Sequence, residues 1–307
     1  MATVLITGGT GMVGKHLTQL LVVKGYEVII VSRSATKNRP HAKVSYALWD
    51  IDKQEIDAHA IAKADHIIHL AGAGVADKKW TAERKREIVE SRTKSSATIV
   101  TALQQLPNKV QTVVSASAIG WYGGDTPESL AKGFTENAPA DTEFLGETCR
   151  LWEQSIEPVS QLGKRLVKLR IGIVLSNDGG ALAEFKKPLQ FGVAGILGNG
   201  KQVVSWIHIE DLCRLFVAAI ENPSLQGVYN AVAPNPVTNK QLTIALAKII
   251  RSSFYVPMHV PTFVLKMMLG ELSVEVLKSA TVSNKKIHDA GFKYTYPTIK
   301  EALESLK

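Results

Sequence analysis

The sequence predicts an α/β protein built on a doubly wound, parallel, Rossmann-type sheet with a smaller, mostly helical C-terminal lobe. Three observations predict this fold. Short apolar, β-branched runs alternate with amphipathic segments from Thr3 to Arg170, as strands and covering helices of a parallel sheet do. A glycine-rich turn, residues 7–14, directly follows the first run. After Arg170 the alternation becomes irregular, which indicates a second, differently built region.

Composition sets the broad class. The chain has 307 residues, 45% of them apolar and 21% charged, which is typical of a folded globular protein and excludes wholesale disorder. With 36 Lys and Arg against 28 Asp and Glu, the net charge is +8. The basic residues form no tract, so a phosphorylated small molecule accounts for this bias as well as nucleic acid does.

Cysteine content and hydropathy predict a cytoplasmic protein. Cys149 and Cys213 are too few for a disulfide framework, which indicates a reducing compartment. The first strand is expected to begin at Thr3, which leaves no room for a signal peptide. No apolar run reaches the roughly 18 residues of a membrane span, and the eight histidines have no metal-ligand spacing, so we expect neither a membrane segment nor a metal site.

The elements follow from the periodicity of apolar residues. The predicted strands are Thr3–Thr7, Glu27–Val31, His66–Leu70, Val110–Ser115 and Arg165–Arg170. The predicted helices between them are Met12–Lys24, Ala82–Leu106 and Leu145–Leu162. Further on we expect a glycine-rich loop at Phe191–Lys201, a strand at Val203–His208, a helix at Ile209–Glu221 and a strand at Gln226–Ala231. Short helices punctuated by proline and glycine are expected from Val256 onward.

This pattern divides the chain into two regions. Residues 1–175 form the predicted dinucleotide-binding domain, to which residues 203–232 return. Residues 176–202 and 233–307 form the predicted substrate or C-terminal lobe.

The glycine turn is the strongest local motif. It lies between the first strand and the first helix, the context in which such a turn binds a dinucleotide. Gly8 permits the tight turn, Gly11 lets a pyrophosphate approach the backbone, and Gly14 lets the helix pack on the strand. The free N–H groups of the helix start would then bind phosphate; the alternative is a turn without a ligand. The candidate residues are Gly8, Thr10, Gly11, Met12, Val13 and Gly14.

The end of the second strand predicts NADP(H) rather than NAD(H). An NAD site usually has Asp or Glu here for the ribose hydroxyls, whereas this chain has Ser32, Arg33 and Ser34. A guanidinium binds a 2′-phosphate that a carboxylate would repel; alternatively Arg33 is simply solvated. Asp50, after the third strand, is a candidate partner for adenine or an ordinary turn residue. In the segment Leu70, Ala71 and Gly72, the small residues suit a backbone that passes close to a cofactor.

Several motifs together resemble the extended short-chain dehydrogenases/reductases of the NAD-dependent epimerase/dehydratase superfamily, and within them an atypical branch of epimerase family proteins. The resemblance covers essentially the whole chain, and residues 256–307 are similar to the small C-terminal domain of that branch. The motifs are the glycine turn, Ala71–Ala73, Lys79–Thr81, Ser91–Thr93, Ser115–Ala118, Trp121–Gly123, Cys149–Glu153, Ser283–Lys286 and Ala290–Phe292.

The resemblance implies a catalytic Tyr, a Lys four residues later and an upstream Ser. Ser117 matches the serine position, with Ser115 as the alternative. Leu145 and Cys149 stand at the Tyr and Lys positions, so the usual proton-transfer pair is absent. Tyr122 is the candidate replacement acid, or a packing aromatic.

Two further residues near this site have open roles. Arg92 stands where many members have Asn, and it is a candidate ligand for the cofactor's phosphate or ribose, a candidate ligand for an anionic substrate, or a helix-surface residue. Cys149 is either an activated thiol or an inert small apolar residue.

Two functions remain after this reasoning. The first is an NADP(H)-dependent oxidoreductase or epimerase-like enzyme with a degenerate site, acting on an unidentified small molecule. The second is a non-catalytic NADP(H)-binding redox sensor. A nucleic-acid partner has the least support, and the resemblance suggests a homodimer.

Overall fold

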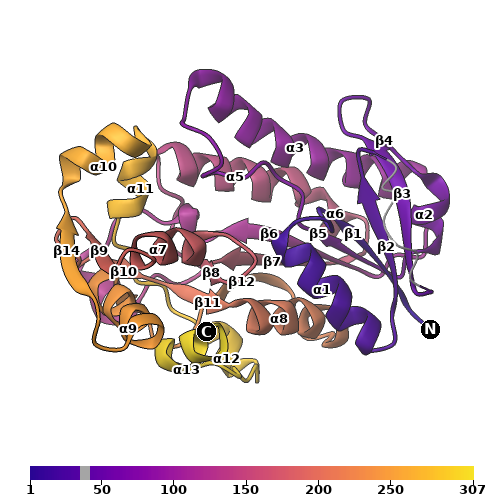
Figure 1. Ribbon diagram of the computed structural model, residues 1–307. Helices are drawn as coiled ribbons and strands as arrows, with labels where there is room; N and C mark the ends of the chain where they lie inside the picture. Colours follow the sequence, from indigo (N-terminus) through magenta and orange to yellow (C-terminus); the bar gives the residue numbers. More distant parts are fainter. Residues whose placement is uncertain (35–41) are drawn as a thin grey trace.

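The computed structural model describes residues 1–34 and 42–307, and the predicted doubly wound sheet is present (Figure 1). Eight strands run in the order β12-β7-β6-β5-β1-β2-β3-β4, and every neighbouring pair is parallel except β3 with β4. The strands are β1 (Thr3–Thr7), β2 (Glu27–Ser32), β3 (Val44–Asp50), β4 (Glu55–Ile56), β5 (His66–His69), β6 (Thr112–Ala118), β7 (Arg165–Ile171) and β12 (Gly227–Ala231).

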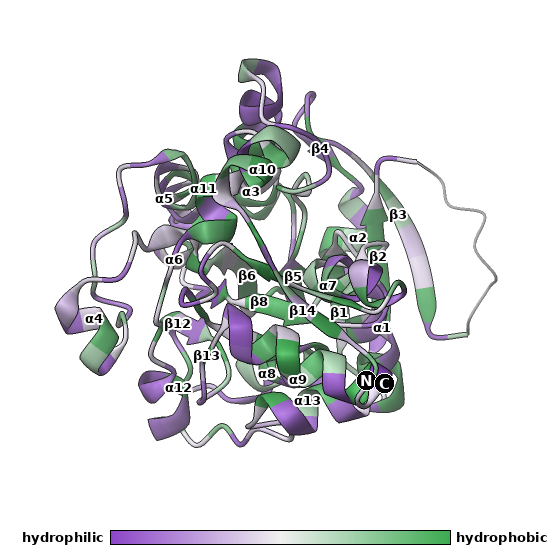
Figure 2. Ribbon diagram, turned by 60° about the vertical axis from the view of Figure 1, so that its left-hand side comes forward, coloured by the Kyte–Doolittle hydropathy of each residue, from purple (hydrophilic) through white to green (hydrophobic). Residues whose placement is uncertain are grey.

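Helices cover both faces of this sheet. α1 (Met12–Val23) and α8 (Ile209–Glu221) pack together on one face. α3 (Ala82–Gln105), α5 (Phe144–Ile156) and α6 (Pro158–Gln161) lie on the other, beside α2 (Ala58–Lys63). Because side chains alternate along a strand, β1 directs Val4 and Ile6 into the core under α1 and α8, and Leu5 into the core under α3. Figure 2 shows these apolar central strands.

Two predicted elements are divided in the structure. The helix expected at Leu145–Leu162 ends at Ile156 and restarts at Pro158, whose missing N–H is tolerated only in a first turn. The strand expected at Val203–His208 is broken at Ser205 into β10 (Val203–Val204) and β11 (Trp206–His208). The Ser205 hydroxyl instead donates to the Ala280 carbonyl at 2.8 Å and accepts from the Val282 amide at 3.0 Å.

A further core, separate from the two that flank the main sheet, forms around Trp206, Leu182, Leu246 and Leu303. The expected loop at Phe191–Lys201 is wrong in part, because it contains β9 (Val193–Leu197), which pairs in parallel with β14 (Val256–Val260). The other elements of this region are β8 (Ile173–Leu175), α7 (Ala181–Leu189), β13 (Val237–Thr238), α9 (Asn239–Arg251), α10 (Thr262–Leu269), α11 (Leu272–Leu277), α12 (Lys285–Asp289) and α13 (Ile299–Ser305).

Segments from both regions are interleaved. The strand β12, near residue 230, completes the edge of the main sheet beside β7. The Asp211 carboxylate at the start of α8 accepts hydrogen bonds from the amides of Thr295 (2.8 Å) and Tyr296 (2.9 Å). The C-terminal tail is thus bound directly to a helix that covers the sheet.

Candidate functional site

The glycine turn between β1 and α1 is closely packed against the segment that follows β5. Gly8 has φ +70°, and a Cβ there would lie 2.9 Å from the carbonyl carbon of Leu70. A Cβ on Gly14 would lie 2.5 Å from the Gly8 carbonyl oxygen and 2.5 Å from Gly9 Cα. Both glycines are therefore required by backbone contacts, and the close approach of Gly8 to Leu70 was not predicted from the sequence.

The start of α1 is open to an anion. Gly11 is the N-cap residue, it offers no side-chain cap, and the first turn contains no acidic residue. Thr10 and Gly11 are exposed, while Met12 and Val13 are partly buried. Uncapped N–H groups and the helix dipole both favour a phosphate at this position.

The carboxyl end of β2 carries an exposed positive charge. Arg33 is exposed, and beside it the Ser32 hydroxyl donates to the Ser34 carbonyl. A hydrogen bond from Arg84 on α3 and, more weakly, the charge of Arg33 lower the pKa of Glu87. Arg33 therefore contributes to a positive potential that reaches the first turns of α3.

Asp50 already has local partners at the end of β3. Its Oδ1 accepts from the amides of Asp52 (3.0 Å) and Lys53 (3.1 Å), which closes the turn toward β4. Its proposed contact with adenine stays a prediction.

The β5–α3 segment is fixed by hydrogen bonds to a buried threonine. Thr7 Oγ1 accepts from the amides of Leu70 (3.2 Å) and Ala71 (3.3 Å) and lies 2.7 Å from Nδ1 of His69. Burial lowers the pKa of His69 to about 3, so the imidazole is neutral at ordinary pH. This network holds the backbone of residues 70–72 at the edge of the sheet.

Arg92 extends from α3 beneath this segment. Its Nη1 donates to the carbonyls of Ala73 (3.0 Å) and Ile88 (2.9 Å). A Cβ on Gly72 would lie 3.2 Å from the guanidinium carbon, which itself lies 5.0 Å from the centre of the Trp152 ring. A side chain at position 72 would thus press on the guanidinium, which would have to shift by a few tenths of an ångström.

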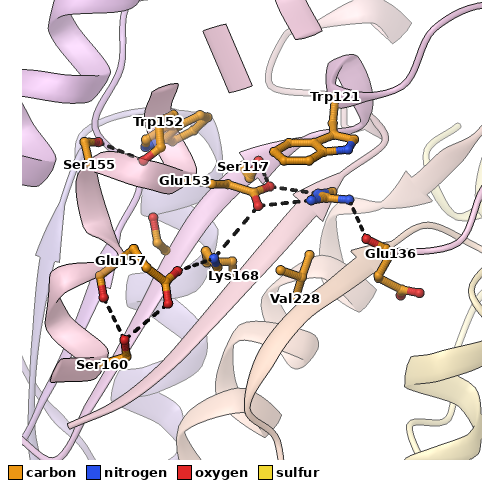
Figure 3. Close-up of polar contacts among 12 residues, drawn as sticks. Ser117, Trp121, Glu136, Trp152, Glu153, Ser155, Glu157, Ser160, Lys168 and Val228 are labelled. Carbon is orange, nitrogen blue, oxygen red and sulfur yellow. Dashed lines mark hydrogen bonds and ion pairs between the residues drawn. The ribbon is translucent and has the colours of Figure 1, made fainter. Parts of the chain in front are cut away.

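Ser117 lies at the carboxyl end of β6, but its hydroxyl is committed. It is 2% exposed and donates to Oε1 of Glu153 at 2.8 Å. Glu153 in turn forms an ion pair with Arg170, with Nε–Oε1 at 2.8 Å and Nη2–Oε2 at 3.1 Å. Figure 3 shows the Glu153 carboxylate beside Ser117 and Trp121. The Arg170 guanidinium carbon lies over the Trp121 ring, 3.6 Å from its centre.

Tyr122 belongs to the same network and is fully buried. Its hydroxyl donates to Oδ1 of Asn230 at 2.7 Å and accepts from Nη1 of Arg170 at 3.0 Å. Burial raises the pKa of Tyr122 to about 12. This geometry favours a role in positioning the loop after β6, and a role as the replacement acid stays a prediction.

Leu145 and Cys149 lie one turn apart on α5 and face Gly120. A Cβ on Gly120 would lie 3.3 Å from Leu145 Cβ and 3.6 Å from Cys149 Sγ. Burial raises the pKa of Cys149 to about 12, although the nearby charge of Arg92 opposes this shift. The thiol therefore stays neutral, and neither side chain can transfer a proton at neutral pH.

Sequence reasoning did not pair Glu153 with Arg170. The available signal was an arginine between two apolar residues, Leu169 and Ile171, in a predicted strand, because a charge that becomes buried there requires a partner. Its partner could not be identified, because Glu153 lies on a different element, α5, and the sequence does not show which acidic residue of the region packs against β7.

The described residues form neither a metal site nor a membrane-spanning helix. No group of three or more His, Cys, Asp or Glu in residues 1–34 and 42–307 is arranged to hold a metal ion. Over the same residues, no helix combines the length and apolarity needed to cross a bilayer.

The sheet, the open helix start and the glycine turn define a protein with a Rossmann-type dinucleotide-binding fold and a small C-terminal lobe. Residues 4–144 match the NAD dependent epimerase/dehydratase family, and residues 260–306 match a domain of unknown function, DUF1731. The chain belongs to this epimerase family.

Similar proteins span the whole chain. The epimerase family protein YfhF of Bacillus subtilis is 34% identical over 99% of this chain and 97% of its own length. The chloroplastic SDR39U1 homolog of Arabidopsis thaliana is 33% identical over 99% of this chain and 86% of its own length. The crystal structure of human epimerase family protein SDR39U1 with NADPH superposes with a TM-score of 0.86, at 26% identity over 99% of this chain and 98% of that one.

Proposed function

We propose that this protein binds NADP(H) across the carboxyl edge of the sheet and acts as an oxidoreductase or epimerase-like enzyme on a small molecule. The observation that carries the proposal is the pairing of an uncapped, acid-free α1 start with an exposed Arg33 at the end of β2. The human relative whose structure was solved with NADPH supports the choice of cofactor.

The residues present suit such a cofactor. The α1 start, from Thr10 to Gly14, would bind the pyrophosphate, and Gly8 would keep the turn compact. Arg33, with Ser32 and Ser34, would bind the 2′-phosphate, and Asp50 the adenine. The remaining cofactor contacts are assigned to Leu70, Ala71, Gly72 and Arg92.

The bound cofactor would supply or accept hydride, and the protein would orient the substrate. The Ser117 O–H group uses its hydrogen in the bond to Glu153. A hydroxyl oxygen can also accept, so Ser117 would accept a hydrogen bond from a substrate hydroxyl. Arg170 and Asn230 would hold Tyr122 and the loop after β6 in place. No proton transfer through Leu145 or Cys149 is part of this proposal.

A non-catalytic NADP(H) sensor is the second candidate. It is favoured by one observation, the burial of Tyr122 and Cys149 together with the raised pKa of each. In that case occupancy of the dinucleotide site would act on a partner and not on a substrate.

Calorimetry with NADPH and NADH tests the proposal. We expect NADPH to bind more tightly than NADH, and Arg33→Asp to reverse that preference. Arg86→Asp, which changes the charge equally at an exposed position of α3, should leave it intact. Absence of binding by both nucleotides to folded, nucleotide-free protein would overturn the proposal. Tight binding without NADPH consumption across a panel of carbonyl compounds would favour the sensor.

Location and assembly follow as further proposals. Both cysteines are buried and free, which is compatible with a reducing cytoplasm. A homodimer is expected by analogy with the wider family, and light scattering of the purified protein measures it directly.

A further inference from the structure

Within residues 1–34 and 42–307, no carboxylate forms an ion pair with Arg92. Among the described residues its hydrogen bonds go only to the carbonyls of Ala73 and Ile88, through Nη1. The titratable groups that interact with it are His69 and Cys149, which are both neutral at ordinary pH, and Arg84, which carries the same charge. A partly buried charge that no acidic group neutralises marks a candidate ligand site.

The position of Arg92 assigns it to one half of a dinucleotide. Its guanidinium lies against Gly72, just past β5, and against Trp152 on α5. Arg33 lies past β2, and the turn after β1 lies between the two, because the strand order is β6-β5-β1-β2. With the pyrophosphate at the α1 start and the 2′-phosphate at Arg33, the nicotinamide half extends toward β5 and β6.

The two redox forms of the cofactor differ in charge at that half. The oxidised nicotinamide ring carries a positive charge, and the dihydronicotinamide ring is neutral. A fixed guanidinium nearby therefore raises the free energy of the oxidised complex and not that of the reduced complex. Trp152 excludes solvent from one side of the guanidinium, which weakens screening of this repulsion.

We propose that Arg92 makes this site selective for the reduced cofactor, so that NADPH binds more tightly than NADP⁺. This inference rests on the proposed NADP(H) site. The expected preference is about tenfold, which corresponds to about 1.4 kcal/mol. A protein with this preference holds NADPH even when much of the cellular pool is oxidised.

Dissociation constants for NADPH and NADP⁺ test the inference directly. In the unsubstituted protein we expect NADP⁺ to bind about tenfold more weakly than NADPH. Arg92→Gln and Arg92→Met, two neutral replacements of different polarity, should reduce this ratio to about twofold or less. Arg92→Lys should preserve most of it, and Arg86→Gln, at an exposed position on the same helix, should leave it unchanged.

Adenosine 2′,5′-bisphosphate, which lacks the nicotinamide half, is the control for an intact site. All variants should bind this compound with equal affinity. If only one of Arg92→Gln and Arg92→Met does so, that variant alone is sufficient for the test. An unchanged NADP⁺ to NADPH ratio in such a variant would overturn the role of Arg92. If the unsubstituted protein binds none of NADPH, NADP⁺ and adenosine 2′,5′-bisphosphate, that result would instead overturn the proposed function.

Discussion

The carboxylate of Glu153 and the guanidinium of Arg170 form a buried ion pair that joins α5 to β7. Two hydrogen bonds of 2.8 and 3.1 Å connect them, and their side chains are 6% and 3% exposed. The same two residues also bind Ser117 and Tyr122, so the pair fixes both predicted catalytic positions.

Replacing Glu153 with Gln should destabilise the fold strongly. The change leaves the Arg170 charge buried without a counter-ion, so we expect the free energy of unfolding to fall by about 3–5 kcal/mol. Glu147→Gln on the same helix removes an exposed ion pair with Arg150 and should change the free energy of unfolding little, because solvent screens such pairs. Urea denaturation of both variants measures the difference, and equal losses would contradict a special role for the buried pair.

Gly14→Ala should damage the dinucleotide site. The added Cβ would lie 2.5 Å from two backbone atoms of the turn, which must shift at a cost of about 1–3 kcal/mol. We expect lower stability together with weaker NADPH binding in calorimetry. Gly124→Ala, where a Cβ meets nothing within 4 Å, is the matched control, and an unaltered Gly14→Ala protein would show that the turn tolerates the shift.

His69 should make the protein sensitive to acid. Its folded-state pKa of about 3 lies below the unfolded value of about 6.5, so the unfolded chain binds more protons between these values. Stability is therefore complete above about pH 6.5 and is lost as pH falls toward 3, by up to about 1.4 kcal/mol per pH unit from this residue. His69→Gln should flatten the dependence of unfolding free energy on pH between 6 and 4. The same slope in both proteins would assign acid sensitivity to other groups.

Asp211→Asn should loosen the C-terminal tail. The carboxylate accepts from the amides of Thr295 and Tyr296 and from Nη1 of Arg214 at 2.8 Å. An amide side chain supplies only one acceptor oxygen, so a donor loses its partner at a cost of about 1–3 kcal/mol. Hydrogen exchange should become faster at residues 295 and 296. Asp289→Asn, on the exposed surface of α12, should leave that exchange unchanged.

Neither cysteine should react with a thiol reagent in the native protein. Burial raises the pKa of Cys149 and of Cys213 to about 12, which leaves a negligible thiolate fraction at pH 8. Titration with a chromogenic disulfide should detect no thiol before denaturation and two afterwards. A thiol that reacts rapidly in the native protein would again make Cys149 a candidate activated thiol.

Features coded by neighbouring residues were predictable from the sequence. The strand β1, the glycine turn and the start of α1 at Met12 occur as predicted, and α8 has the predicted bounds Ile209–Glu221. In each case local periodicity and a local start signal agree. β9 was missed because its partner, β14, lies about 60 residues further along the chain, and such pairings leave no local pattern.

The same distinction applies to the candidate site. The phosphate turn and Arg33 could be proposed because each role depends on a residue and its place at a strand end. The surroundings of Tyr122 could not, because its partners Arg170 and Asn230 come from β7 and β12. Burial of a hydroxyl depends on which strands become neighbours, and this is a property of the assembled sheet.

The interleaving of β12 with the C-terminal tail has a consequence for synthesis on the ribosome. The side-chain amide of Asn230 donates to the carbonyls of Phe134 and Ser283. The backbone amide of Thr295 donates to the carboxylate of Asp211. During translation, the β12 edge of the main sheet therefore gains its last hydrogen bonds only when nearly the last residues have been synthesised. A nascent chain stalled before that point would have all eight strands of the sheet, but Asn230 and Asp211 would lack these C-terminal partners.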